Sequence, residues 1–114
     1  MKSAQSNPMI QSAVTDLWDC HRMCEEMIAE CLRRGGEHAG PDRIRMLTDC
    51  ADICQLTADF LVRNSEVASK MCGICAEMCI RCAEMFERTG DDQFAQKCRK
   101  CADSCRQMAT SMAG

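Results

Sequence analysis

Hydrophobic and thiol side chains recur along the chain in alternating steps of three and four residues. The first such row consists of Ile10, Ala13, Leu17, Cys20, Cys24, Met27 and Cys31. Residues three and four apart share one face of an α-helix, so this row predicts a helix with one buried face. Pro8 suits the first helical turn with Ser6 or Asn7 as N-cap, and Gly35 ends the helix, which we expect over residues 8–34.

Three further rows with the same step predict three further helices, over residues 41–64, 65–89 and 91–113. The second row is Leu47, Cys50, Cys54, Thr57 and Leu61. The third row is Ala68, Cys72, Cys75, Cys79, Cys82 and Phe86. The fourth row is Phe94, Cys98, Cys101, Cys105, Met108 and Met112. Each row gives its helix one apolar, thiol-rich face that needs a partner to bury it.

Turn residues separate these helices at short intervals. Asn64 can adopt the left-handed conformation that ends the second helix, and Ser65 can cap the third. Gly90 ends the third helix, and Asp91 can cap the fourth. Because connections this short make neighbouring helices antiparallel, we expect one domain over the whole chain with an all-α fold. The predicted architecture is an antiparallel up-down-up-down four-helix bundle with a cysteine-lined core.

In such a bundle the four rows face inward and bring all the cysteines together. Counting about 1.5 Å per residue from the end that holds Gly35–Gly40 and Gly90, here called the glycine end, predicts the height of each thiol. Two flat four-thiol layers result, one of Cys24, Cys50, Cys79 and Cys101 and one of Cys20, Cys54, Cys75 and Cys105. Compared with these two layers, the count places three thiols nearer to the glycine end, namely Cys31, Cys82 and Cys98. It places one thiol, Cys72, farthest from that end. Beyond the thiols it predicts an apolar plug of Ile10, Ala13, Leu17, Leu61, Ala68 and Met112.

The composition narrows the possible functions. The chain has 12 Cys and 10 Met in 114 residues, so sulfur replaces much of the usual core carbon. A disulfide scaffold is disfavoured, because its cysteines would be scattered among loops rather than placed on helical faces. The net charge of −3 argues against a nucleic-acid partner, and no apolar run reaches membrane-span length. The start of the chain shows no secretory signal, so we expect a cytoplasmic protein with free thiols.

Inward rows of thiols favour soft metal ions. Cu(I) prefers thiolate ligands and accepts low coordination numbers, and a thiolate can bridge two ions. We therefore expect multiple Cu(I) ions, about one for each of the 12 cysteines. One Cu(I) per thiolate also keeps the core neutral, so metal binding should release protons and stabilise the fold.

Zinc is the chemical rival. Cys72 and Cys75, Cys79 and Cys82, and Cys98 and Cys101 form CxxC spacings, which commonly mark Zn(II) sites when they lie in loops. Here the spacings fall within helices and continue into further thiols, which closed four-cysteine sites do not need. Four-thiol layers would still accept Zn(II), so a zinc-stapled structural or interaction bundle remains an alternative.

Several other residues are weaker candidates. Met27, Met46, Met85 and His38 lie toward the glycine end, where we expect copper to reach the thiols, and each is a possible ligand on that path. His21 flanks the first thiol row and is expected to be partly solvated rather than a ligand. Trp18 should point outward and serve a subunit contact.

No arrangement of catalytic groups is visible in the sequence. The chain lacks a nucleophile–base pair with a third orienting group, a phosphate-binding loop and paired inward carboxylates. We therefore expect a protein that is not an enzyme. A lower-capacity copper chaperone or sensor is a further alternative to a store.

Three stretches, CADICQLTADF, MCGICAEMCIRCAEM and CRKCADSCRQMA, resemble the cytosolic copper storage proteins, the Csp family. The resemblance covers residues 47–109 most closely. It implies a four-helix bundle, assembled as a homo-tetramer, that stores many Cu(I) ions along its core. As partners of such a store we expect copper-exchanging chaperones or small thiols. The resemblance also implies that all twelve cysteines are metal ligands: Cys20, Cys24, Cys31, Cys50, Cys54, Cys72, Cys75, Cys79, Cys82, Cys98, Cys101 and Cys105.

Overall fold

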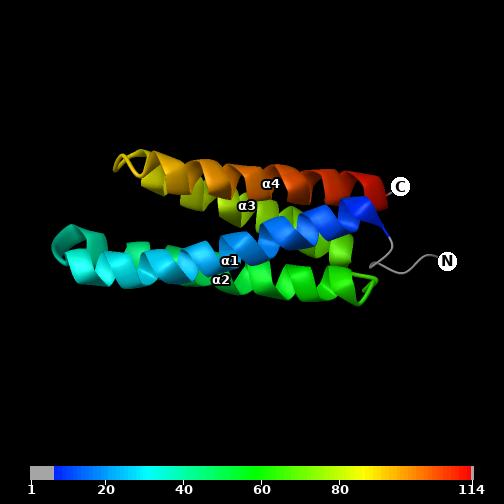
Figure 1. Ribbon diagram of the computed structural model, residues 1–114, viewed down its shortest axis with the longest axis horizontal. Coiled ribbons are helices and arrows are strands. Elements are labelled where there is room, and N and C mark those ends of the chain that lie inside the picture. Colours follow the sequence, from blue (N-terminus) through cyan, green and yellow to red (C-terminus); the bar gives the residue numbers. More distant parts are fainter. Residues whose placement is uncertain (1–6, 114) are drawn as a thin grey trace.

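The computed structural model describes residues 7–113 and shows four long helices side by side (Figure 1). They are α1 (Pro8–Arg34), α2 (Pro41–Val62), α3 (Ala68–Glu87) and α4 (Asp92–Ala113), with a short 3-10 helix, η2 (Gly36–Ala39), between α1 and α2. Successive helices run antiparallel, and the bundle measures 51 × 20 × 19 Å. The predicted up-down-up-down four-helix bundle is confirmed.

The first helix begins and ends where the sequence indicates. The Asn7 side chain accepts hydrogen bonds from the backbone N–H groups of Met9 and Ile10, at 2.9 and 3.3 Å, which makes Asn7 the N-cap. The alternative cap, Ser6, lies outside the described residues. At the other end Gly35 has a φ of 72°, and its N–H donates to the carbonyl of Cys31. A residue without a Cβ adopts this left-handed φ at little cost.

The turn between α2 and α3 is longer than expected. Asn64 does adopt a positive φ, 56°, and Ser65 N–H donates to the carbonyl of Phe60 at 2.9 Å, which closes the helix end. This closure uses residues 63–65, so α2 ends at Val62 rather than at residue 64. The prediction of Ser65 as N-cap of α3 is wrong, because its hydroxyl accepts from Val67 N–H and the helix starts only at Ala68.

The turn between α3 and α4 closes in the same way. Gly90 has a φ of 81°, and the N–H of Asp91 donates to the carbonyl of Phe86 at 3.0 Å. The last residue of α3 is Glu87, two residues before the predicted end. Asp91 precedes α4, but its carboxylate binds Arg34 and Thr89 instead of serving as the predicted side-chain cap.

The core follows the predicted rows. Its largest fully buried side chains include Phe86, Leu17, Leu47 and Leu61. In the expected apolar plug, Ala13, Leu17, Leu61 and Ala68 are buried and Ile10 is half-buried. The side chain of Met112 lies outside the described part of α4. Within residues 7–113, no helix has the length and apolar character to cross a membrane.

Polar contacts fix α1 against its two neighbours. The His21 ring Nδ1 lies 2.8 Å from the backbone carbonyl oxygen of Ala51 in α2. On the other side, the Ser104 hydroxyl of α4 donates to the carboxylate of Asp16. Toward the glycine end, α1 diverges from α4 and stays close to α2 (Figure 1).

Candidate metal centre

The inner faces of the four helices form a continuous column of thiols. All twelve cysteines are buried, and all are free thiols. The Sγ atom of Cys54 lies 3.8 Å from that of Cys75 and 3.7 Å from that of Cys79. The Sγ atoms of Cys50 and Cys79 are 3.9 Å apart. These separations are far longer than the roughly 2.05 Å of a disulfide bond, so the thiols are in contact but not cross-linked.

Three groups of thiols are compact enough to surround a metal ion, because the sulfur atoms of each group lie within 4.8 Å of one another. The first group is Cys20, Cys50, Cys54 and Cys79. The second is Cys54, Cys75, Cys79 and Cys101. The third is Cys24, Cys50 and Cys82. Because the groups share Cys50, Cys54 and Cys79, they overlap instead of forming closed sites.

The predicted pairings of Cys50 with Cys79 and of Cys54 with Cys75 are confirmed, but the cysteines of α1 and α4 do not complete the two predicted flat layers. Cys24 lies with Cys82 and Cys98, not level with Cys79 and Cys101. Cys20 is correspondingly level with Cys79. The count assumed that both hairpins end at one height, but the α1–α2 hairpin extends beyond the α3–α4 hairpin at the glycine end (Figure 1). The cysteines of α1 are therefore displaced by about one turn relative to those of α3 and α4.

The thiols at the two ends of the column have fewer thiol neighbours than those in its middle. Cys72 has Cys105 as its thiol neighbour. Cys31 lies nearest the glycine end, as predicted, and its charged neighbours are Arg43, Arg34 and Asp91. Burial raises the pKa of the Cys31 thiol above its ordinary value of 9.0. Cys31 therefore keeps its proton at neutral pH until a metal displaces it.

Within the column, neighbouring thiols also stabilise the protonated form of Cys24. The pKa of Cys24 is raised because its S–H group interacts with Cys20 and Cys50, and because it is buried. Soft metal ions bind the thiolate, so binding must release this proton. Without metal the column is therefore neutral, and the negative charge of a thiolate forms only when a metal cation binds it.

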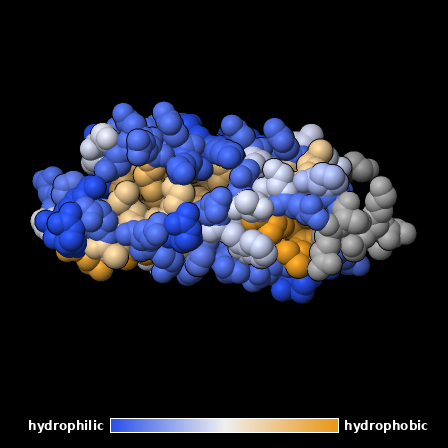
Figure 2. All heavy atoms as spheres, viewed as in Figure 1, coloured by the Kyte–Doolittle hydropathy of each residue, from blue (hydrophilic) through white to orange (hydrophobic). Residues whose placement is uncertain are grey.

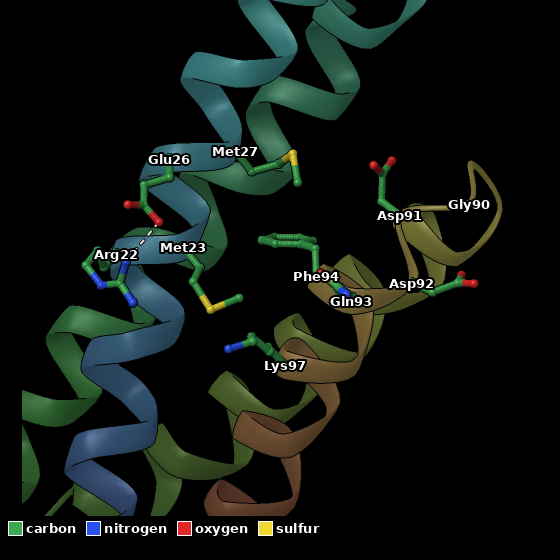
Figure 3. Close-up of a pocket in the computed structure, with 10 residues that line it drawn as sticks. All are labelled: Arg22, Met23, Glu26, Met27, Gly90, Asp91, Asp92, Gln93, Phe94 and Lys97. Carbon is green, nitrogen blue, oxygen red and sulfur yellow. Dashed lines mark hydrogen bonds and ion pairs between the residues drawn. The ribbon is translucent and has the colours of Figure 1, made fainter.

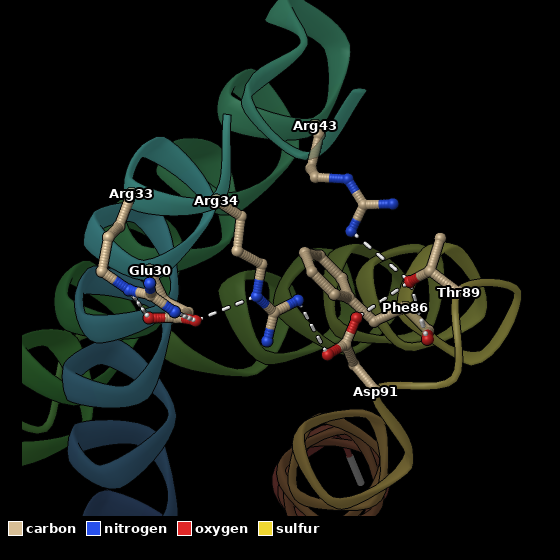
Figure 4. A network of polar contacts seen from close by, with 7 residues as sticks. All are labelled: Glu30, Arg33, Arg34, Arg43, Phe86, Thr89 and Asp91. Carbon is tan, nitrogen blue, oxygen red and sulfur yellow. Dashed lines mark hydrogen bonds and ion pairs between the residues drawn. The ribbon is translucent and has the colours of Figure 1, made fainter. Parts of the chain in front are cut away.

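An aromatic and ionic cluster closes the glycine end (Figure 4). The fully buried ring of Phe86 packs edge-to-face on Phe94, with 4.8 Å between ring centroids, and the Arg43 guanidinium lies 4.6 Å from the Phe86 centroid. Arg34 bridges Glu30, at 2.9 Å, and Asp91, at 3.2 Å. Three of these charged residues, Arg34, Arg43 and Asp91, are neighbours of Cys31.

The predicted flanking residues lie at different places around the column. Met85 lines a surface hollow with residues of η2 and the start of α2, and Met46 packs on the outside of the core. His38 lies in η2 and is half-buried. His21 is half-buried and bonded to α2, and Trp18 points outward with 47% of its surface exposed, as expected.

A groove between α1 and α4 was not predicted from the sequence. It has a volume of about 630 Å³, and its lining includes Met23, Met27, Phe94 and Lys97 (Figure 3). The carboxylates of Glu26, Asp91 and Asp92 line it as well. The space-filling view shows hydrophobic side chains in this hollow, bordered by hydrophilic ones (Figure 2). The only available sequence signal was the spacing of Met23 and Met27, four residues apart on one helix face. Whether α4 would pack against that face depends on the angle between the helices.

Comparison with known proteins identifies relatives along nearly the whole chain. The family model described as copper storage protein (Csp) matches residues 6–110. The cysteine-rich protein YhjQ of Bacillus subtilis (strain 168), which is uncharacterized, is 31% identical over 95 residues. The match covers 80% of this chain and 87% of YhjQ.

Solved structures share the fold. The Nmul_A1745 protein of Nitrosospira multiformis is 37% identical, with a TM-score of 0.86 over 90% of this chain and 96% of that protein. The Cu(I)-bound copper storage protein Csp3 of Bacillus subtilis is 26% identical, with a TM-score of 0.74 over 93% of this chain and 99% of Csp3.

Proposed function

This chain belongs to the copper storage protein family and stores Cu(I), and we propose that all twelve cysteines of the column hold the metal. The observation that carries the proposal is the overlap of the thiol groups. Cys50, Cys54 and Cys79 each belong to two groups, as expected of thiolates that bridge neighbouring ions. A row of bridging thiolates accommodates about one Cu(I) per cysteine, whereas separate closed sites would hold fewer ions.

The chemistry of the column fits a store. Cu(I) is soft and prefers thiolate, and each ion neutralises one thiolate in a core that tolerates no uncompensated charge. The raised pKa values of Cys24 and Cys31 keep these thiols protonated and neutral without metal. Loading therefore exchanges protons for copper ions and leaves the charge of the core unchanged.

Zn(II) is the competing metal ion to test. The group of Cys54, Cys75, Cys79 and Cys101 has the four thiols that a structural Zn(II) site uses. Closed tetrahedral sites do not share ligands, and twelve thiols divided among such sites would bind about three Zn(II) ions. The capacity of the protein therefore separates the two functions.

The decisive experiment is an anaerobic Cu(I) titration of the reduced protein with a competing chelator and a metal count after desalting. We expect about one Cu(I) per cysteine, and the loss of thiol reactivity should keep pace with copper bound. Saturation at two or three ions, or tighter binding of Zn(II) under the same conditions, would contradict the store and support a zinc-stapled bundle.

We further propose how the store operates. The protein acts as one four-helix domain in the reducing cytoplasm, turns over no substrate, and exchanges copper with chaperones or small thiols. The free thiols support a reducing compartment. A homo-tetramer is the proposed assembly, and exposed Trp18, Leu56 and Ile74 are available for subunit contacts. Light scattering during size exclusion tests the assembly, and a mass of one chain would overturn it.

A further inference from the structure

We propose that Cu(I) reaches the thiol column from the side, through the groove between α1 and α4, and that Met23 and Met27 are soft ligands along this route. The inference rests on the proposed storage function and adds to it a route and a donor. The donor is an anionic complex of Cu(I) with two small-molecule thiolates. We call this route the α1–α4 port.

The first support is the connection between the groove and the thiols. A second, smaller cavity of about 70 Å³ lies between the same two helices, and its lining includes Cys20 and Cys101. Met23 and Lys97 line both the groove and this inner cavity, so the two spaces adjoin. Cys20 and Cys101 retain 2% and 1% of their surface, whereas the other ten cysteines retain 0%. The two thiols that retain any accessible surface are thus those that line the inner cavity.

The second support is the position of these two thiols in the column. Cys20 belongs to the group with Cys50, Cys54 and Cys79, and Cys101 to the group with Cys54, Cys75 and Cys79. The Sγ atom of each of these two thiols lies within 4.8 Å of three further sulfur atoms that can take over the ion. Copper therefore enters the densest part of the column, from which bridging thiolates lead toward both ends.

The third support is the chemistry of the groove wall. Met23 and Met27 project into the groove from α1, opposite Phe94 and Lys97 of α4 (Figure 3). Thioethers bind Cu(I) but discriminate against hard cations such as Mg²⁺. The groove carries charges of both signs: Glu26 is paired with Arg22 and Asp91 with Arg34, and Asp92 and Lys97 also line it. We assign the approach of an anionic copper complex to the Lys97 ammonium, which lies next to the inner cavity. At the glycine end, by contrast, the charged neighbours of Cys31 are Arg34, Arg43 and Asp91, which offer no soft ligand.

The transfer is a ligand exchange without electron transfer. Copper remains Cu(I) while its bonds to two carrier thiolates break and bonds to protein sulfur form. Each protein thiol that becomes a ligand loses one proton, and each departing carrier thiolate can take up one. The inner cavity of about 70 Å³ is too small for the intact carrier complex, so the carrier must be released in the groove.

The test measures the rate of copper uptake by stopped flow, with Cu(I) held by excess N-acetylcysteine under anaerobic conditions. The port variant is Met23→Leu/Met27→Leu, which preserves side-chain volume but removes both thioethers. Its matched control is Met46→Leu/Met85→Leu, outside the groove. We expect uptake to slow about fivefold to tenfold in the port variant, with the final capacity and the control unchanged.

A charge-reversal pair tests the approach of the carrier. Lys97→Glu should slow uptake of the anionic complex and reverse the salt dependence of the rate, because attraction becomes repulsion. Lys70→Glu changes the net charge equally on the exposed face of α3 and should leave the rate unchanged. Equal effects of both substitutions would contradict attraction at the port.

A third measurement needs no variant. Brief alkylation of the metal-free protein, followed by mass spectrometry, should modify Cys20 and Cys101 before the other ten cysteines. Unchanged uptake in Met23→Leu/Met27→Leu, or first modification at Cys31, would overturn the port and favour the glycine end. A wild-type capacity of only two or three ions would instead overturn the storage function, and the port with it.

Discussion

The Sγ atoms of Cys54 and Cys79 lie 3.7 Å apart across the interface of α2 and α3, and both residues belong to both four-thiol groups. This pair therefore connects the half of the column around Cys20 with the half around Cys101. The facing sides of two antiparallel helices meet at every third or fourth residue, so the same register brings Cys54 to Cys75 and Cys50 to Cys79. The α2–α3 interface is thus the centre of the store.

Replacing a shared thiol should reduce the capacity more than replacing a terminal one. Cys54→Ser removes a ligand of two groups, so we expect a loss of about two Cu(I) per chain. Cys31→Ser removes a thiol that lies outside the three groups and should cost about one ion or fewer. Anaerobic titration with a metal count measures both losses. Equal losses would show that the thiols act independently and do not bridge ions.

A new thiol in the right register should extend the column. Thr57 is fully buried on the cysteine face of α2, and its hydroxyl has no hydrogen-bond partner among the residues from 7 to 113. The pairing of Cys54 with Cys75 places Thr57 opposite Cys72. We expect Thr57→Cys to add about one Cu(I) without loss of stability, because it also removes an unsatisfied buried hydroxyl.

The control for this substitution is Leu56→Cys, which adds a thiol one residue away at an exposed position. It should leave the number of tightly bound ions unchanged, since its thiol points away from the column. Equal gains in the two variants would mean that the capacity depends on the number of thiols and not on their position.

The metal-free protein should lose stability at alkaline pH. The folded-state pKa of Cys31 is raised above 9.0 by burial, so the folded protein retains a proton that the unfolded chain releases. The resulting stability is fully present below pH 9 and is lost as the pH rises through the folded-state pKa. Urea unfolding at pH 7 to 10 measures this fall, and Cys31→Ser should make it shallower. A stability that rises above pH 9 would contradict the direction of the shift.

Truncation of the aromatic cluster should destabilise the fold strongly. Phe86 is fully buried against Phe94 and Arg43, so Phe86→Ala removes apolar contacts and leaves a cavity, at a cost of about 3–5 kcal/mol. Leu32→Ala, at a position with 57% exposure, should change the free energy of unfolding by less than about 0.5 kcal/mol. Urea titration of the metal-free proteins distinguishes the two. Similar effects would show that the cluster adds little to the core.

Copper loading should raise the unfolding temperature. A ligand present at 100 times its dissociation constant stabilises the folded state by about 2.7 kcal/mol. For a domain of this size, that gain raises the midpoint by about 10 °C or more. Scanning calorimetry of the metal-free and loaded protein measures the shift, and removal of copper by a strong chelator should reverse it. An unchanged midpoint would mean that copper binds the unfolded chain equally well.

Much of this architecture follows directly from the sequence. The step of three and four residues assigned Cys20, Cys54, Cys79 and Cys101 to inward faces, because helical geometry depends only on local spacing. Asn7 was one of two predicted caps, and Gly35 the predicted stop, for the same local reason. The predicted end of α2 and start of α3 were wrong because the turn between these helices needs several residues. The turn around Asn64 and Ser65 uses the positions that the sequence had assigned to the helix ends.

The sequence by itself determined that there are four amphipathic helices and that sulfur lines their common core, since both follow from residue types at fixed spacing. Only the tertiary structure decided which thiols meet. The offset of the two hairpins replaced flat layers with overlapping groups, and the divergence of α1 from α4 opened the groove beside Met23. Both depend on how the helices slide and cross, which is set by side-chain packing between segments distant in the chain and not by the periodicity of any one helix.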